Sequence, residues 1–141
     1  MDASDPLLLD THAWVWMEEG LSHKFKRGTR AMLERASRDR ALVVSAISVW
    51  EIGMLAGSDR LRLGKPLDDW IAMARAAPGL TLAPVTPEIA LDASRLAALD
   101  HGDPADRLII ATARSLNATL LTCDERILAY GKLGHCRARH P

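Results

Sequence analysis

Short runs of consecutive apolar residues alternate along the chain with longer segments in which apolar residues recur every three or four positions. Leu7–Leu9 and residues 41–45 are continuous apolar runs, typical of strands that are buried on both faces. Helical spacing appears between such runs, as with Trp14, Met17 and Leu21 at positions i, i+3 and i+7. The pattern predicts strands at residues 7–9, 41–45, 80–84 and 119–122, with a weak edge strand at 134–139. It predicts helices at residues 11–19, 24–40, 47–57, 67–77, 88–99, 104–117 and 125–130.

This alternation of strands and helices indicates βαβ units, which build a mainly parallel sheet. We therefore predict an α/β fold. The sequence has no repeat, low-complexity tract or long linker, so we expect residues 1–141 to form a single domain. A domain of this length typically buries roughly 68–70% of its unfolded surface, so a sizeable core is possible without disulfides.

Composition changes this picture little. Eighteen Lys and Arg residues balance eighteen Asp and Glu residues, so nucleic-acid binding would have to come from a local patch or a metal. Cys123 and Cys136 are too few and wrongly spaced for a disulfide framework or a zinc site. The first residues lack the pattern of a signal peptide, and no apolar run approaches the roughly 20 residues of a membrane span. We expect a reduced, cytoplasmic protein.

Four acidic residues stand where a predicted strand gives way to a helix, or where a helix opens. They are Asp10, Glu51, Asp106 and Asp124. In an open parallel sheet such positions share the edge at the carboxyl ends of the strands, where ligands bind. Carboxylates that meet there without compensation would repel one another and stay partly protonated. We therefore expect a divalent cation to hold them together.

Helix capping is the simpler explanation for the aspartates taken singly. Asp is a favoured capping residue, and Asp103-Pro104-Ala105-Asp106 is a good helix start by itself. Glu51 resists this explanation, although it could close a capping box with Ser48. It is the only charged residue between Ala41 and Gly57, and helical spacing places it among apolar neighbours. A lone buried carboxylate is costly, so we expect Glu51 to be protonated, paired or bound to metal.

Oxygen ligands without His or Cys suit Mg²⁺ or Mn²⁺ better than zinc. Such a site can orient a phosphodiester, activate water and stabilise the leaving oxygen. The arrangement favours phosphoryl transfer or phosphodiester hydrolysis.

At these residues the chain resembles PIN-domain proteins, and more narrowly the VapC toxins of bacterial toxin–antitoxin pairs. The resemblance covers nearly the whole chain. Its segments are residues 8–14 (Leu-Leu-Asp-Thr-His-Ala-Trp), residues 45–52 (Ser-Ala-Ile-Ser-Val-Trp-Glu-Ile), residues 103–113, which begin Asp-Pro-Ala-Asp-Arg, and residues 121–124 (Leu-Thr-Cys-Asp). The ordered set is specific, although no single segment is decisive.

This resemblance implies a three-layer α/β/α sandwich with a central parallel sheet in the order 3-2-1-4-5. It implies a catalytic set of Asp10, Glu51, Asp106 and Asp124, with Mg²⁺ or Mn²⁺ held by Asp10, Asp106 and Asp124. Asp103, Thr11, Thr122 and Arg107 are secondary candidates. The implied activity is endoribonuclease cleavage of RNA, inhibited by a cognate VapB-type antitoxin. We expect that partner to occupy an apolar groove near the second helix and to place an Arg or Lys at the acidic site.

The resemblance also implies a homodimer, and Trp14, Trp16, Leu61, Leu63 and Leu67 are the apolar residues that we expect at its interface. A basic run, Lys24, Lys26, Arg27 and Arg30, is either a solvated helix face or a patch that contacts phosphates.

Two other functions stay open. One is a haloacid-dehalogenase-like phosphatase, which also begins with a strand that ends in Asp. That chemistry needs a second Asp two residues on, where this chain has His12. The other is a catalytically silent PIN-like module that only binds partners. The presence of all four acids argues against it.

Overall fold

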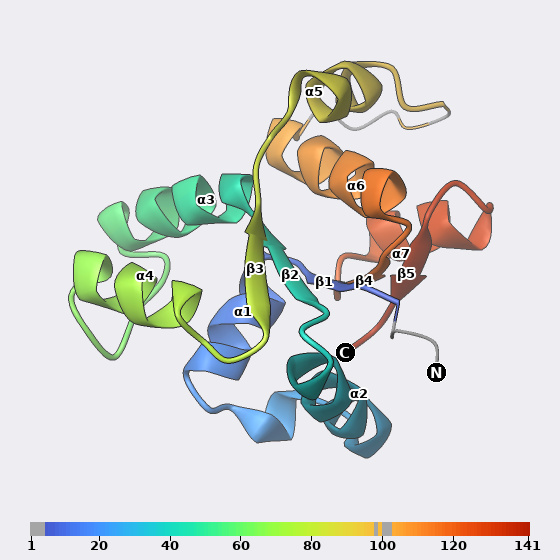
Figure 1. Cartoon of the computed structure of the whole chain (residues 1–141). Helices are drawn as coiled ribbons and strands as arrows, with labels where there is room; N and C mark the ends of the chain where they lie inside the picture. Colours follow the sequence, from blue (N-terminus) through green and yellow to red (C-terminus); the bar gives the residue numbers. More distant parts are fainter. Residues whose placement is uncertain (1–4, 98, 100–102) are drawn as a thin grey trace.

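Five parallel strands in the order β3-β2-β1-β4-β5 form the centre of the molecule (Figure 1). The computed structural model describes residues 5–97, 99 and 103–141. The strands are β1 (Leu7–Leu9), β2 (Leu42–Ser45), β3 (Leu80–Ala83), β4 (Thr119–Leu121) and β5 (Arg137–Arg139). The predicted α/β fold and strand order are confirmed.

The inner strands are hydrophobic because each strand has a helical layer on both faces. In β1, Leu7 and Leu9 point to one layer and Leu8 to the other, and all three are buried. The pairing of Leu8 with Val43 and Leu120 continues this alternation across the sheet. Complete burial of one such aliphatic side chain stabilises the fold by about 1.5–3 kcal/mol.

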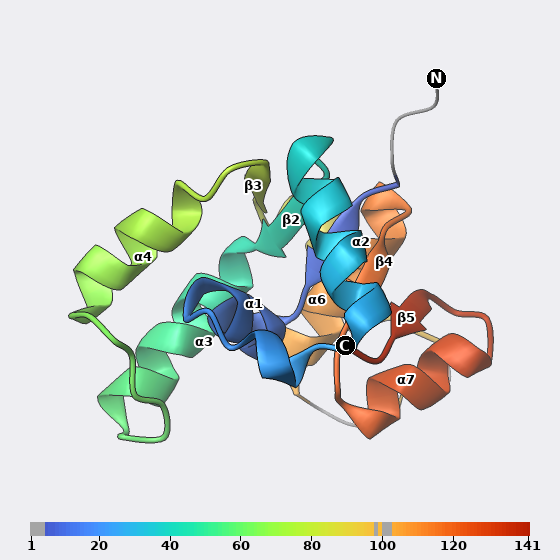
Figure 2. The same ribbon diagram turned by 90° about the horizontal axis from the view of Figure 1, so that it is seen from below.

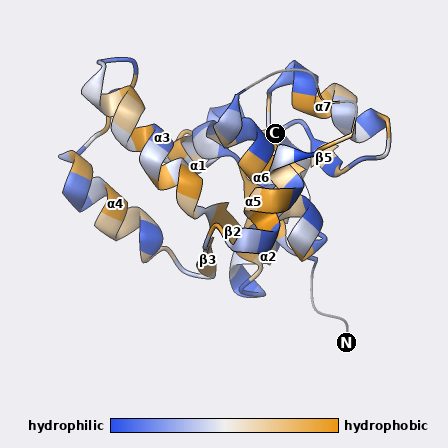
Figure 3. Ribbon diagram, turned by 90° about the horizontal axis from the view of Figure 1, so that it is seen from above, coloured by the Kyte–Doolittle hydropathy of each residue, from blue (hydrophilic) through white to orange (hydrophobic). Residues whose placement is uncertain are grey.

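Two groups of helices enclose the sheet. The cluster around Leu7 and Leu9 contains residues of α1 (Thr11–Glu18), α2 (Arg27–Arg38), α3 (Ala46–Gly57) and α4 (Leu67–Arg75). The cluster around Leu8 contains residues of α6 (Pro104–Leu116) and α7 (Glu125–Lys132), and α5 (Pro87–Ser94) packs against α6. Figure 3 shows hydrophobic residues on β2 and α6 near the centre and hydrophilic residues over much of α2.

The predicted helix at 24–40 is wrong at its start. A short 3-10 helix, Ser22–Lys24, comes first, and α2 begins only at Arg27. Between them Phe25 has an extended backbone, with φ −110° and ψ 138°. Its ring is buried and packs edge-on against Trp16, with the ring centroids 6.0 Å apart. Burial of this ring breaks the helix.

The predicted helix at 88–99 is too long, because α5 ends at Ser94 with Arg95 as its C-cap. Residues 98 and 100–102 lie outside the described part of the chain. At the other predicted helices and strands, the ends differ by one or a few residues. No helix in the described residues is both long and apolar enough to span a bilayer.

Candidate functional site

Three aspartates begin helices at the carboxyl edge of the sheet or beside it. Asp10 follows β1 and caps α1, where it accepts a hydrogen bond of 2.9 Å from the backbone N–H of Ala13. Asp124 comes after β4 and caps α7. Asp103 caps α6, so the side chain of Asp106 is not needed as that cap. The capping explanation therefore holds for Asp10, Asp103 and Asp124, and a cap can still present its second carboxylate oxygen to a ligand.

Two threonine hydroxyls hold the carboxylates in place. Thr122 is completely buried, and its hydroxyl accepts a 3.1 Å hydrogen bond from the N–H of Asp124. The same hydroxyl is hydrogen-bonded to the Asp10 carboxylate, so it links the ends of β1 and β4. Buried Thr11 plays the corresponding role for Glu51, because its hydroxyl donates to Glu51 Oε1.

The Glu51 contact extends to a third hydroxyl. Thr11 Oγ1 lies 2.9 Å from Oγ of the buried Ser48. A hydroxyl has one proton, so when Thr11 donates to Glu51 it must accept from Ser48. Ser48 therefore does not form the capping box considered above. The cap of α3 is Ser45, whose hydroxyl accepts from the N–H of Ile47 at 3.1 Å.

Glu51 lies at the edge of the core and not inside it. Its neighbours Trp50 and Met54 are 57% and 56% exposed, so the apolar arc around Glu51 faces solvent in part. The expectation that helical spacing alone would bury Glu51 in the core is wrong. The Thr11 contact is what brings this carboxylate to the site.

Burial and mutual repulsion raise the carboxyl pKa values. Desolvation raises the pKa of Asp106 to about 7, and the charges of Asp103, Asp124, Glu51 and Asp10 add to this rise. Desolvation is also the largest cause of the raised pKa of Asp10 and of Glu51, each opposed by a threonine hydrogen bond. The five acids therefore act on one another electrostatically although they come from four separate segments.

The donor chemistry of this cluster suits Mg²⁺ or Mn²⁺, which prefer carboxylate oxygens. Within the described residues no three His, Cys, Asp or Glu side chains are arranged as a ready-made ion cage. The carboxylates influence one another's pKa values, and their meeting at one point stays a prediction. An open site still fits Mg²⁺, because this ion commonly keeps several waters and uses one or two carboxylates.

Arg107, a secondary candidate, contacts backbone carbonyls. Its Nε donates to the carbonyl of Ala93 at 2.8 Å, and its Nη1 donates to that of Leu99 at 3.1 Å. These bonds tie α6 to the end of α5 and the segment after it, which indicates a positioning role.

His12 was not among the expected site residues. It is exposed on the first turn of α1, and its charge, when present, favours the ionised forms of both Asp10 and Glu51. The signal in the sequence is its place two residues after Asp10, where a haloacid-dehalogenase-like phosphatase has its second Asp.

Known proteins resemble this chain over most of its length. A family model described as PIN domain matches residues 7–133. Ribonuclease VapC22 of Mycobacterium tuberculosis (strain ATCC 25618 / H37Rv) is 33% identical over 135 residues, which are 96% of this chain and 93% of that protein.

Solved structures show the same fold at low identity. The complex VapBC2 from Rickettsia felis, bound to a DNA fragment from its promoter, contains a chain with a TM-score of 0.67 and 16% identity, covering 95% of this chain and 97% of that one. FitAcB from Neisseria gonorrhoeae contains another, with a TM-score of 0.61 and 22% identity, covering 96% and 97%.

Proposed function

The chain belongs to the PIN-domain family, and on that premise we propose that it is a metal-dependent endoribonuclease, the toxin of a VapBC-type toxin–antitoxin pair. The observation that carries this proposal is the electrostatic coupling of Asp10, Glu51, Asp106 and Asp124 at one edge of the sheet. The 33% identical relative is named a ribonuclease, which supports the reaction class. Family membership also argues against the haloacid-dehalogenase-like phosphatase.

The proposed site holds Mg²⁺ or Mn²⁺ through Asp10, Asp106 and Asp124. A bound ion would supply positive charge to the scissile phosphate and lower the pKa of an attacking water. The chain itself supplies the orientation of the ligands: Thr122 fixes Asp10, and Thr11 fixes Glu51. Desolvation is the largest cause of the raised pKa of Asp106 and repulsion from the neighbouring carboxylates adds to it, so a bound cation would relieve this repulsion.

A cleavage assay on structured RNAs tests the proposal. We expect the wild-type protein to cut RNA with Mg²⁺ or Mn²⁺ and to lose activity in EDTA. Asp10→Asn keeps the size and the capping ability of the side chain, so it should fold and lose at least about 100-fold in rate. Asp69→Asn, an identical change at an exposed position of α4, should cut like wild type. A folded wild-type protein that cuts none of these RNAs with either metal would leave the silent binding module as the function.

The proposed antitoxin would dock in a groove between α1 and α2. A groove of about 480 Å³ lies there, and its lining combines apolar residues such as Met17 and Leu33 with the charged Glu18, Glu34 and Arg38. A smaller one of about 190 Å³ continues past Met17 and Leu33 to Trp16 and Phe25. Thr11 and Met17 are six residues apart in α1, which corresponds to about 9 Å along the helix axis. An apolar segment that contacts Met17 in this groove therefore lies about 9 Å from the start of α1.

The acidic site suits a guanidinium from such a partner, since Arg is always charged and binds carboxylates in a fork. Co-expression with the neighbouring open reading frame tests the pairing. We expect growth to be rescued and a small protein to co-purify. In a matched test, Met17→Glu at a partly exposed position of the groove should abolish co-purification, whereas Leu91→Glu on exposed α5 should not. Toxicity that persists, without a co-purifying protein, would refute it.

A further inference from the structure

The zero net charge of the chain conceals a separation of charge between segments. Residues 20–33 and 126–141 together contain eight of the eighteen Lys and Arg residues and none of the eighteen Asp and Glu residues. The rest of the chain has ten basic and eighteen acidic residues, a formal charge of −8. An anion therefore meets two different environments on this molecule.

The fold joins these two segments into one surface, although almost 100 residues separate them in sequence. The N–H of Lys26 donates to the carbonyl of Pro141 at 3.2 Å. The Arg139 guanidinium lies 3.8 Å from the position that a Cβ on Gly28 would occupy. Figure 2 shows the start of α2 beside the C-terminal end of the chain. We call the surface formed by Lys24, Lys26, Arg27, Arg30 and Arg139 the basic surface.

The basic surface borders the carboxylate site. The N–H of Thr122, the residue that holds Asp10, donates to the carbonyl of Arg139 at 3.0 Å. In the sheet β5 is two positions from β1, which corresponds to about 10 Å at the usual strand spacing. This separation exceeds the Debye length of about 8 Å at physiological ionic strength, so a bound strand that contacts both regions, and not direct attraction between them, would connect them.

The cations of this surface are available to a ligand. All five side chains belong to exposed residues. Within residues 5–97, 99 and 103–141, none of the five forms an ion pair with a carboxylate. Arg137 differs, because it bonds to Asp5 and to the carbonyl of Asn117 at the opposite end of β5. Lys24 is held over the ring of Trp16, with its ammonium 5.4 Å from the ring centroid.

We propose that the basic surface binds the phosphates of the RNA strand on one side of the scissile bond. This inference rests on the proposed ribonuclease function. A cluster of carboxylates repels RNA, and an adjacent set of unpaired cations offsets that repulsion and releases counterions from the strand. Contacts to phosphates position a strand without reading its sequence. The RNA therefore enters the site over β5 and the start of α2, and not over the exposed face of α3.

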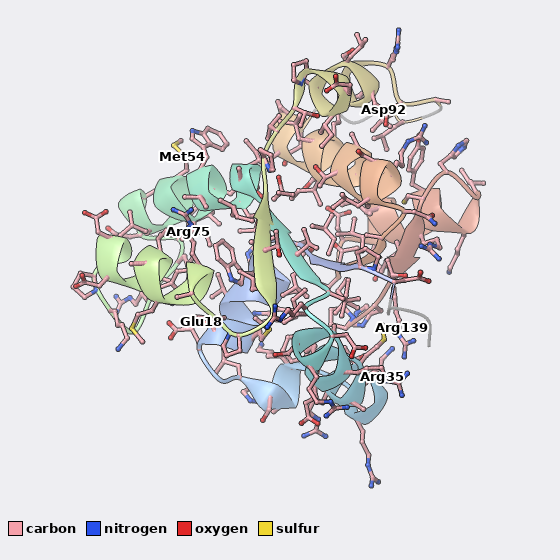
Figure 4. The ribbon with its side chains drawn as sticks, viewed as in Figure 1. Glu18, Arg35, Met54, Arg75, Asp92 and Arg139 are labelled. Carbon is pink, nitrogen blue, oxygen red and sulfur yellow. The ribbon has the colours of Figure 1, made fainter. Side chains whose placement is uncertain are left out.

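RNA binding measured in EDTA tests the basic surface separately from cleavage, because EDTA removes the metal that the proposed cleavage requires. The probe is a fluorescein-labelled single-stranded RNA of mixed sequence, and its affinity is followed by anisotropy as KCl is raised. Arg27→Gln/Arg30→Gln removes two cations from the surface. The matched control is Arg75→Gln/Arg95→Gln, two exposed arginines on other elements. In Figure 4, Arg75 on α4 and Arg139 lie on opposite sides of the molecule.

We expect the surface variant to bind about tenfold more weakly, with a salt slope lower by about 1.4, which corresponds to two lost phosphate contacts on a single strand. The control should bind like wild type. A second variant, Lys24→Gln/Lys26→Gln, should show the same loss, which guards against a folding defect in the first. Equal affinities and slopes for both surface variants and the control would overturn the proposal and leave an acidic protein segment as the occupant.

Cleavage separates this proposal from the function on which it rests. If wild type binds the probe with the expected slope but cuts no RNA, the basic surface stands and the ribonuclease function fails. If wild type cuts RNA and the surface variants keep its KM, the basic surface fails and the ribonuclease function stands.

Discussion

Individual hydroxyls and carboxylates determine the chemistry of the site at the residue scale. Thr11 and Thr122 are buried, so their hydroxyl positions are rigid, and each fixes one carboxylate. The clearest electrostatic consequence falls on Asp106, which has no threonine partner among the causes of its raised pKa.

The pKa of about 7 at Asp106 predicts an unusual dependence of stability on pH. The usual Asp pKa is 3.8, so between about pH 4 and pH 7 the folded protein binds more protons than the unfolded chain. The metal-free protein should therefore lose stability as the pH rises through this window. Asp106→Asn should remove that loss and stabilise the protein at pH 8 by about 1–2 kcal/mol, after allowance for solvent screening.

Urea unfolding in EDTA at pH 5 and pH 8 measures this difference. Asp69→Asn is the control, because it makes the same change at an exposed position of α4. A pH profile of Asp106→Asn that runs parallel to that of wild type would show that Asp106 is not the group responsible.

Thr11 should affect catalysis through Glu51. Thr11→Val keeps the shape of the side chain but removes its hydroxyl, so the pKa of Glu51 should rise further. We expect a loss of about 10–100-fold in kcat/KM, the range of one hydrogen bond to a charged group. The loss should be larger at pH 6 than at pH 8. Thr11→Ser restores the hydroxyl and should recover most of the activity, whereas a merely structural role would give a loss that does not vary with pH.

Contacts between segments constrain the helices at the element scale. Gly79 precedes β3 with a φ of +76°, and a Cβ there would lie 2.0 Å from the carbonyl oxygen of Ser37 at the end of α2. Ser37 also donates a 2.9 Å hydrogen bond to the carbonyl of Pro78. Backbone contact at this point holds the end of α2 against the start of β3.

Gly79→Ala should destabilise the protein by about 3 kcal/mol or more, because it combines a left-handed backbone with a collision against backbone atoms. Gly20 has a similar φ of +71° but open space around it, so Gly20→Ala should cost only about 1 kcal/mol. Chemical denaturation measures both changes. Equal losses in the two variants would mean that α2 shifts freely away from β3.

At the scale of the whole molecule, α3 presents two exposed apolar side chains that bear on self-association. The expected dimer residue Trp14 is completely buried and packs edge-on against Trp70, so it is a core residue and cannot lie at an interface. Leu61, Leu63 and Leu67 are partly buried against the same core. Trp50 and Met54 are the more exposed pair, and Figure 4 shows Met54 on the outer side of α3.

We therefore propose that a homodimer forms through the outer face of α3, because exposed Trp and Met side chains on one helix favour a two-fold contact. Trp50→Arg should convert a dimer to a monomer in light scattering at micromolar concentration. Met73→Arg, on the exposed side of α4, should leave the mass unchanged. A wild-type protein that is already monomeric would contradict the prediction.

The sequence by itself determined the α/β class, most of the elements and the family. Buried parallel strands read as continuous apolar runs, and helix starts carry Asp and Pro, so both signals are local. Asp10, Glu51, Asp106 and Asp124 could be selected for the same reason, since each lies at such a boundary.

Only the tertiary structure decided what these residues meet. The contact of Thr11 with Glu51, the raised pKa of Asp106 and the exposure of Trp50 depend on distances between segments that are remote in sequence. Burial of Phe25 interrupted a helix that local spacing favoured. The joining of residues 20–33 with the C-terminal segment is of the same kind, because a balanced composition carries no information on where its charges gather in space.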